Sequence, residues 1–467
     1  MPVDILSKIF AEGLGSIPYG WTIVKAAPLL ALLYALKFYF NGATNGSERN
    51  MHSKVVMITG GTSGIGAEVA KGLASRGAQI VLLTQTPLTD PFLVDYIMDL
   101  RTQTNNEMIT AEHVDLTSLH SIRVFATKWV DNAPPRRLDT IILCANTRTP
   151  TGGKATTTED GLETTWGLNY MANFHLLSIL SPALRAQPPD RDVRIIFGTC
   201  SSYLGGKLPE FAPETSGAKG KAKGKKDGPE SIAFTPSGVY ATSKLALMTF
   251  AIAFQKHLSA YARPDKNPVN ARVIIVDPGW TRTPGMRRFL TFGSLWGLAL
   301  YLISWPLWWL ILKSGDQGAQ TFLYAAMEAQ WGRGDGGVFL KECGEYKFMR
   351  SEIEDEGVQK KLWEVSEATV QALEKEGAVR RARDKKAEEA GKKKEEKEKE
   401  REGGRVQWSK MGLEGRSRGK GNEDRLVVDG DIWGLWRCRC VYEKATYICW
   451  SDGIQVLSGL DKKFIDL

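Results

Sequence analysis

The sequence has few cysteines and no cluster of metal ligands. Six cysteines occur among 467 residues, which is too few for a disulfide framework in a chain of this length. Cys144 lies in an apolar, strand-like run, so we expect the main body of the chain to be reduced and to face the cytosol. The five histidines lie far apart, without the spacing of metal ligands. We therefore predict no metal site.

Basic charge is present, but it lacks the pattern of a nucleic-acid-binding face. The net charge is +8, yet the lysines gather between Lys219 and Lys226, beside glycine and without interleaved aromatic residues. We predict no nucleic-acid partner. A basic patch lying against anionic lipid headgroups remains compatible with this composition.

The first 50 residues lack a markedly basic start and a clear cleavage site, so we do not expect a removed signal peptide. Their apolar stretch, 21–40, is interrupted by Lys25, Pro28 and Lys37. It is marginal in length and hydrophobicity for a spanning helix. An interfacial anchor, a spanning anchor and a buried helix all stay open, and we interpret residues 1–50 as a hydrophobic, membrane-anchor segment.

A strand, a glycine loop and a helix are predicted next. Residues 55–58 form a continuous apolar run, typical of a strand buried on both faces of a parallel sheet. The run leads into Thr59-Gly60-Gly61-Thr62-Ser63-Gly64-Ile65-Gly66, and a helical pattern follows. The glycines permit close backbone approach, and the helix N-terminus offers N–H donors to a pyrophosphate. This order predicts a dinucleotide site.

Apolar runs and helical patterns continue to alternate along the chain. Further strands are predicted at 80–83, 109–114, 140–144, 194–197, 273–276 and 338–340. The alternation predicts an α/β fold with a Rossmann-type, doubly wound parallel sheet. The second strand ends at Thr84-Gln85 without the carboxylate that NAD-preferring sites usually place there. We therefore favour NADP(H) over NAD(H), although no arginine replaces the carboxylate.

Tyr240-Ala241-Thr242-Ser243-Lys244 provides an acid/base pair. Residues four apart lie on one face of a helix, which brings the Lys244 ammonium near the Tyr240 phenol. A phenol has an ordinary pKa of about 10, and a nearby positive charge lowers it. The pair can thus exchange protons near neutral pH.

Taken in order, these motifs resemble the short-chain dehydrogenases/reductases, and more narrowly their retinol-dehydrogenase-like branch. Supporting stretches are Asp115-Leu116-Thr117-Ser118-Leu119, Gln317-Gly318-Ala319-Gln320-Thr321 and Leu362-Trp363-Glu364-Val365-Ser366. The likeness covers about 51–375, which we expect to be one NAD(P)-binding domain. The sequence is also similar to fungal members of the branch that associate with lipid droplets or vacuolar membranes.

The resemblance implies a role for each matching residue. The residues expected to hold the pyrophosphate are Gly60, Gly64, Ile65 and Gly66. Asp115 would contact the adenine, and Thr283 would hold the nicotinamide carboxamide. Tyr240 would be the general acid in reduction and the base in oxidation, while Lys244 would lower its pKa and bind the nicotinamide ribose. Asn169 would support the proton relay, and Asn169 and Tyr240 are also expected to contribute to cofactor binding.

Two positions depart from the family pattern. The chain has Leu143-Cys144-Ala145-Asn146 where the family usually has Asn-Asn-Ala-Gly, so Asn146 replaces a glycine. A serine after the fifth strand should hydrogen-bond the substrate carbonyl. Counted without a gap, Cys200 falls on that position, whereas Ser201 needs a one-residue bulge and Ser202 a two-residue shift. A thiol is a poor donor, so we predict Ser201.

An uncharged segment, 289–312, follows the cofactor loop and contains four tryptophans. As a helix it would extend about 36 Å, enough to cross a hydrocarbon core of about 30 Å. Both of its ends must return to the same sheet, which excludes a single crossing. We expect a re-entrant or shallow hydrophobic hairpin with Gly293, Gly297 and Pro306 as candidate bends, or a lid over the substrate site. A helix packed on the domain is the alternative.

Two further segments lie outside the motifs. The insertion 208–235 is rich in lysine, glycine and proline, and we expect it to be disordered. Residues 376–467 form a charged, low-complexity and irregular tail.

Together these features predict a membrane-associated, NADP-preferring oxidoreductase that interconverts a lipophilic alcohol and its aldehyde or ketone. The expected partners are a lipophilic small molecule and a membrane or lipid-droplet surface, and a homodimer is left open. The expected location is a lipid droplet, the endoplasmic reticulum or the vacuolar membrane. The alternative is a cofactor-binding regulator or scaffold that has lost catalysis. The altered 143–146 loop favours that alternative, and the intact Tyr240, Lys244 and Asn169 oppose it.

Overall fold

The computed structural model describes residues 20–134, 136–208, 235–264, 266–267 and 269–414, with four short strands between 441 and 455. Apart from its two ends, the insertion predicted at 208–235 lies outside the described residues. The same holds for much of the predicted tail beyond residue 414.

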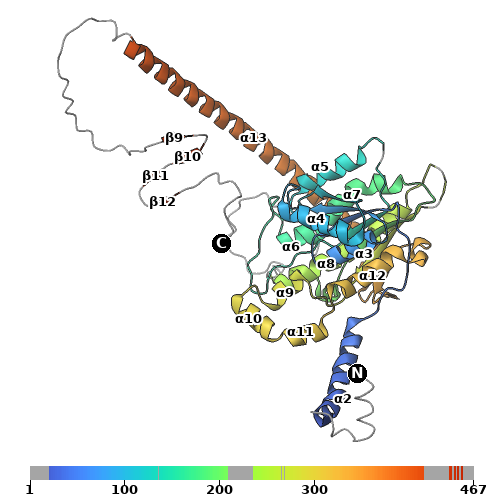
Figure 1. Cartoon of the computed structure of the whole chain (residues 1–467). Coiled ribbons are helices and arrows are strands. Elements are labelled where there is room, and N and C mark those ends of the chain that lie inside the picture. The colour runs from blue at the N-terminus through green and yellow to red at the C-terminus, as the bar shows by residue number, and fades with distance from the viewer. Residues whose placement is uncertain are drawn as a thin grey trace, which may run out of the picture. The chain divides into compact units, whose positions relative to one another are not determined.

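An eight-stranded sheet forms the centre of the first unit of the chain (Figure 1). The strand order is β3-β2-β1-β4-β5-β6-β7-β8, and every neighbouring pair up to β7 is parallel. The strands are β1 Val55–Thr59, β2 Gln79–Thr84, β3 Ile109–His113, β4 Thr140–Leu143, β5 Val193–Gly198, β6 Ala271–Asp277, β7 Val338–Lys341 and β8 Gly344–Tyr346. The predicted doubly wound sheet is confirmed. The unpredicted β8 is a three-residue strand that returns antiparallel to β7.

Helices cover both faces of the sheet. They are α3 Gly64–Ala74, α4 Pro91–Thr104, α5 Leu119–Val130, α6 Thr164–Trp166, α7 Ala172–Arg185, α8 Pro236–Ser259 and α12 Gly315–Met327. One core contains side chains from α5, α7 and α8, and the other from α3, α4 and α12. Val55 and Met57 of β1 belong to the first core, and Val56 and Ile58 to the second. This two-sided burial explains the continuous apolar runs of the sequence.

The last long helix, α13 Glu356–Glu414, begins on the sheet domain. Its side chains Leu362 and Val370 are buried in the first core. Ser366 Oγ lies 2.7 Å from the Tyr170 hydroxyl. The chain divides into two compact units, 1–385 and 386–467.

The second unit, described by itself, contains two antiparallel strand pairs. The first pair is β9 Val441–Glu443 with β10 Thr446–Ile448. The second is β11 Trp450–Ser451 with β12 Ile454–Gln455.

Residues 289–312 contain the end of α9 Pro284–Leu290 and two further helices, α10 Leu295–Ile303 and α11 Trp305–Ile311. The chain turns at Gly293, whose φ is +67°, and again at Ser304, before Pro306 in the first turn of α11. Gly297 lies within α10 and is not a bend. Arg282 N donates to Lys313 O, and Lys313 N donates to Trp280 O, each at 2.9 Å. The chain just before α9 and the chain just after α11 therefore lie together.

The amino-terminal helix, α2 Gly20–Asn41, lies beside α11. Lys37 Nζ donates to the backbone oxygens of Trp309 at 2.7 Å and Leu312 at 3.2 Å. Within the described part of the chain, α8 is the one helix whose length and composition would suit a membrane span. Because 67% of its apolar window is buried, we assign it to the core.

Candidate active site

A cavity of about 580 Å³ lies at the carboxyl ends of the parallel strands. Its lining comes from the glycine loop after β1, the ends of β2 and β3, the loops after β4, β5 and β6, and α9. Tyr240 of α8 faces the same space. Ligands of open parallel sheets bind at this edge.

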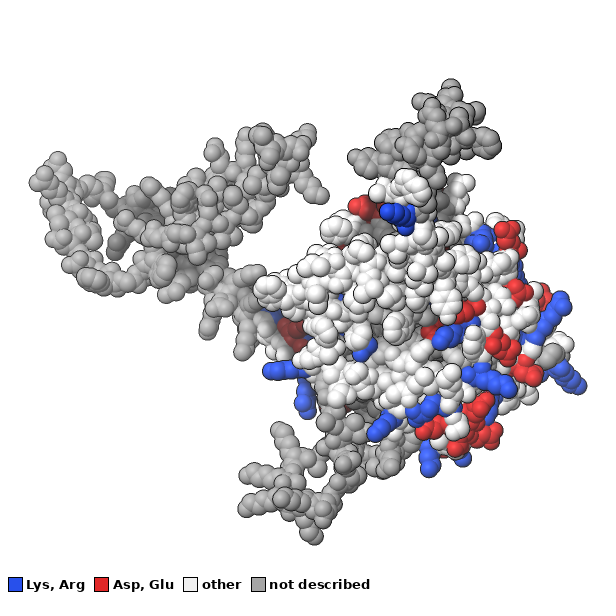
Figure 2. Space-filling model, turned by 90° about the horizontal axis from the view of Figure 1, so that it is seen from below, with Lys and Arg blue, Asp and Glu red and all other residues white. Residues whose placement is uncertain are grey.

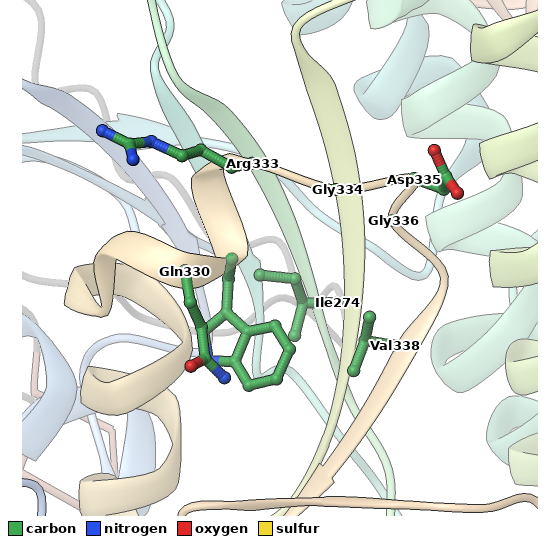
Figure 3. Close-up of a pocket in the computed structure, with 8 residues that line it drawn as sticks. Ile274, Gln330, Arg333, Gly334, Asp335, Gly336 and Val338 are labelled. Carbon is green, nitrogen blue, oxygen red and sulfur yellow. The ribbon is translucent and has the colours of Figure 1, made fainter.

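A second cavity of about 360 Å³ lies at the amino end of β7 (Figure 3). It is lined by Ile274 of β6, by Val338 of β7 and by residues of the stretch that connects α12 to β7. Those residues are Gln330, Trp331, Arg333, Gly334, Asp335 and Gly336. In Figure 3 the Arg333 side chain points away from Ile274 and Val338. The glycine loop and Tyr240 line the larger cavity, so we treat that cavity as the candidate active site.

The glycine loop is shaped for a nucleotide pyrophosphate. Gly60 has a φ of +67°, and a Cβ there would stand 2.8 Å from Ala145 Cα. A Cβ on Gly66 would collide with the carbonyl oxygen of Gly60. Ser63 precedes α3 without capping it through its side chain, which leaves first-turn N–H groups for an anion. Gly64 and Ile65 also line the cavity, so the residues present fit a dinucleotide.

Two other predicted cofactor residues, Thr283 and Asp115, differ in whether they line the cavity. Thr283 lines the cavity, and its Oγ1 accepts from Met286 N at 3.2 Å, which caps α9. The neighbours of Asp115, Val114 and Leu116, line the cavity. The Asp115 carboxylate instead accepts from Thr117 N at 2.8 Å and from Thr117 Oγ1 at 2.7 Å. Contact of Asp115 with an adenine stays a prediction.

The Tyr240 hydroxyl contacts side chains from the loops after β4 and β5. Its oxygen accepts from Asn146 Nδ2 at 3.0 Å and from Cys200 Sγ at 3.4 Å. Burial raises the pKa of Tyr240, and Cys200 adds to the rise, whereas the Asn146 amide and the Arg148 guanidinium lower that pKa. The hydroxyl therefore depends on its neighbours to become a useful acid/base.

Lys244 lies one turn after Tyr240 and is buried. Its Nζ donates to Gly198 O at 3.0 Å and stands 5.8 Å from the centre of the Tyr240 ring. Burial lowers the pKa of Lys244, and Cys200, Cys144 and Asp277 oppose that change. The structure thus brings the predicted pair together, with the ammonium beside the ring.

Asn169 lies in a short π-helical turn, Gly167–Met171, and is fully buried. Its Oδ1 accepts from Thr147 N at 2.8 Å, and its Nδ2 donates to Thr147 O at 2.9 Å. Nδ2 also lies 3.3 Å from Ser243 Oγ. The amide therefore holds the loop after β4 against α8.

Ser201 lines the cavity, but the hydrogen bonds of its hydroxyl go to groups other than Tyr240, so its contact with a substrate carbonyl stays a prediction. Ser201 Oγ donates to Asp277 Oδ2 at 2.7 Å and lies 3.5 Å from Lys341 Nζ. Cys200 is still extended, with φ −159° and ψ 160°, and the following 3₁₀ turn begins at Ser201. Without a bulge, the thiol of Cys200 takes the position next to Tyr240. Ser202 also lines the cavity.

Arg148 is a site residue that the sequence reasoning missed. Its guanidinium lies 5.1 Å from the centre of the Tyr240 ring and 3.9 Å from that of Phe289. Burial lowers the pKa of Arg148. The sequence signal that could have found Arg148 is its position, two residues after the altered 143–146 stretch at the carboxyl end of a strand.

Comparison with known proteins agrees with this geometry. Residues 54–208 match the family described as short chain dehydrogenase. The chain is 41% identical to "Uncharacterized oxidoreductase pbr1" of Schizosaccharomyces pombe, over 80% of this chain and 97% of that protein. It is 30% identical to human "Retinol dehydrogenase 13", over 73% of this chain and 90% of that protein. It is 29% identical to human "Polyprenol dehydrogenase", over 67% of this chain and 84% of that protein.

A parallel sheet with a glycine loop and a Tyr/Lys pair at its carboxyl edge defines an NAD(P)-dependent oxidoreductase. The chain belongs to the short-chain dehydrogenase/reductase family, in its retinol-dehydrogenase-like branch.

Proposed function

We propose that this enzyme is an NADP-preferring oxidoreductase that interconverts a lipophilic alcohol and its aldehyde or ketone at a membrane surface. The observation that carries the proposal is that Tyr240 opens into a cavity whose wall, α9, leads directly into the exposed apolar helices α10 and α11. The acid/base group and the apolar surface thus belong to one continuous region of the chain.

Tyr240 handles the proton in this proposal. In this family the bound nicotinamide supplies the hydride in reduction and accepts it in oxidation. In reduction the Tyr240 hydroxyl gives its proton to the oxygen of the carbonyl substrate, which becomes the alcohol. In oxidation the phenolate takes the alcohol proton while the carbinol carbon loses its hydride. Lys244 and Arg148 flank the ring with positive charge, which favours the phenolate.

The lipophilic substrate class is supported by the lining and by the names of the relatives. The cavity lining includes the apolar side chains of Trp280, Met286 and Phe289. Two relatives carry the names retinol dehydrogenase and polyprenol dehydrogenase. Long apolar alcohols and aldehydes suit both observations.

The preference for NADP(H) rests on the end of β2. Thr84, Gln85 and Thr86 line the cavity there and bear no negative charge, so no carboxylate of this stretch would repel a 2′-phosphate. The ratio of kcat/KM for NADPH and NADH tests the preference. Gln85→Asp should lower that ratio by about tenfold or more, the effect of roughly 1.4 kcal/mol of repulsion. A wild-type enzyme that prefers NADH would overturn this part of the proposal.

Membrane association rests on exposed apolar side chains. Leu295 and Trp296 of α10 are 85% and 86% exposed. Further exposed apolar residues of α2, α10 and α11 are Leu29, Leu30, Tyr34, Phe38, Leu300, Leu302, Ile303 and Trp309. Figure 2, seen from below relative to Figure 1, shows a broad central area without charged side chains, most of which lie toward the right and lower edges of the view. Such a surface with tryptophans suits a lipid interface.

Vesicle flotation tests the membrane part. Leu295→Glu with Trp296→Glu should release the protein from phosphatidylcholine vesicles, while Phe92→Glu, an exposed apolar residue of α4, should leave binding intact. Equal flotation of wild type, the double variant and Phe92→Glu would contradict a membrane-facing α10.

Fluorescence imaging of the tagged protein distinguishes lipid droplet, endoplasmic reticulum and vacuolar membrane, with the catalytic domain expected on the cytosolic side.

The substrate class is tested by NADPH consumption with purified protein in vesicles. Long-chain and isoprenoid aldehydes should give kcat/KM values at least about tenfold above those of short, water-soluble aldehydes, because each buried methylene contributes about 0.8 kcal/mol. A preference for short substrates would overturn the proposal.

A further inference from the structure

The loop after β4 reaches the acid/base group of this enzyme directly. Asn146 Nδ2 donates to the Tyr240 oxygen at 3.0 Å. The next residue, Thr147, is held by two hydrogen bonds to the buried Asn169. Asn146 therefore sits on a fixed piece of backbone, although it occupies a position where the family usually has glycine.

Arg148 belongs to the same loop and faces the same ring. Its guanidinium lies between the Tyr240 and Phe289 rings. Its Nε is buried and has no hydrogen-bond partner among the described residues. A positive charge without a carboxylate partner is available to a neighbouring anion.

The other polar side chains around Tyr240 either hydrogen-bond to other groups or are weak donors. The Ser201 hydroxyl donates to Asp277, and Lys244 Nζ donates to Gly198 O. Cys200 offers a thiol, which is a weak donor. Among the described residues, the titratable or charged groups that face Tyr240 are thus Cys200, Arg148 and Lys244.

We propose that Asn146 and Arg148 are positioning residues that stabilise the phenolate of Tyr240. The loop after β4 then shares a function that the sequence analysis assigned to Lys244 alone. The Tyr240 oxygen accepts from the Asn146 amide, which leaves the Tyr240 proton free to point at a substrate oxygen. When that proton leaves, the amide bond becomes charge-assisted and strengthens. The Arg148 guanidinium adds its charge over the ring.

The proposal rests on Tyr240 as acid/base, but its first test needs no substrate. Absorbance difference titration against Tyr240→Phe reports the phenolate of Tyr240 directly. Asn146→Leu keeps the side-chain size and removes the donor, and should move the titration of Tyr240 upward by about one to two pH units. Arg148→Met should also move it upward, and Arg148→Lys less so.

Kinetic pH profiles provide the second readout. In oxidation, kcat rises as Tyr240 loses its proton, so the rising limb should shift to higher pH in Asn146→Leu by the same amount as the spectroscopic titration. Asn132→Leu, the same substitution at an exposed asparagine of the loop between α5 and β4, serves as the matched control and should leave the limb in place. If Asn146→Leu fails to fold, Arg148→Met provides the same test, because it removes the positive charge near the Tyr240 ring.

The outcomes separate this inference from the proposed function. An unchanged Tyr240 titration in both Asn146→Leu and Arg148→Met overturns the inference, whatever substrate the enzyme uses. A shifted titration together with a Tyr240→Phe enzyme of full activity supports the electrostatic role and overturns Tyr240 as acid/base.

Discussion

At the scale of single residues, the Tyr240 hydroxyl receives opposing influences. Burial and the Cys200 thiol raise its pKa, and Asn146 and Arg148 lower it. The outcome is set by groups from two loops, the one after β4 and the one after β5. A phenol in this position can serve both directions of the reaction only while these influences stay balanced.

Tyr240→Phe is predicted to lower kcat by about 10²- to 10⁴-fold, the usual contribution of a general acid or base. The ring and its contact with Arg148 stay in place, so NADPH binding should weaken far less than kcat falls. Steady-state kinetics with a matched NADPH titration checks both points. A variant with full activity would remove Tyr240 from the chemistry.

Ser201→Ala and Cys200→Ala test which residue acts beside Tyr240. Ser201→Ala should destabilise the fold by about 1–3 kcal/mol, because buried Asp277 loses its hydroxyl donor, and kcat should stay near the wild-type value. Cys200→Ala should alter the pH profile, since its thiol touches the Tyr240 oxygen. Thermal unfolding and kcat together decide between them. A collapse of kcat in a stable Ser201→Ala protein would restore the serine to the role predicted from the sequence.

At the residue scale, the proximity of Tyr240 and Lys244 could be predicted because spacing alone decides it. Tyr240 and Lys244 are four apart on a helix, so their proximity follows from helix geometry. The position after β5 depends on where an extended strand gives way to a turn, a one-residue difference that the sequence could not decide. Arg148 was missed because its partner Phe289 lies far along the chain and meets it only in the folded protein.

At the scale of elements, strands buried on both faces were predictable and segments with mixed surroundings were not. β1, β2 and β4 are continuous apolar runs because each face meets a separate core. β8 is short and pairs with β7 alone. The division of 289–312 into α9, α10 and α11 depends on local turns at Gly293 and Ser304. The turn at Gly293 was among the predicted bends, whereas the turn at Ser304 was not.

The docking of α13 is predicted to be sensitive to acid through His175 of α7. Burial and the charge of Arg123 lower its pKa from 6.5 to about 4, although Glu374 Oε1 of α13 lies 3.2 Å from its Nε2. Because the unfolded chain binds the proton more readily, the stability from neutral His175 is complete above pH 6.5 and is lost as pH falls toward 4.

Melting temperatures of wild type and His175→Gln between pH 7.5 and 4 check this prediction. The gap between the two proteins should narrow as pH falls, since only the wild type has to protonate a buried imidazole. A gap that stays constant would assign His175 a packing role without titration.

At the scale of the whole molecule, we propose that 1–50 is the anchor segment, 51–375 the catalytic domain and 376–467 an appended tail. Truncation after Lys385 should preserve activity and melting temperature, since the first compact unit ends there. Truncation after Glu354 should abolish folding, because it removes buried Leu362 and Val370 and the Ser366 partner of Tyr170. Activity and circular dichroism of both proteins check this. A stable, active protein ending at Glu354 would contradict a structural role for α13.

The hydrogen bonds between Lys313 and residues 280–282 join the two ends of the apolar helices at the rim of the cavity. If the cavity wall faces lipid, as we propose, the enzyme would meet its substrate as a solute of the surface rather than of the surrounding water. The relevant concentration is then the mole fraction of substrate among lipids. Adding inert lipid at constant total substrate should slow the reaction, whereas diluting the whole suspension, once all protein is bound, should leave the turnover per enzyme unchanged.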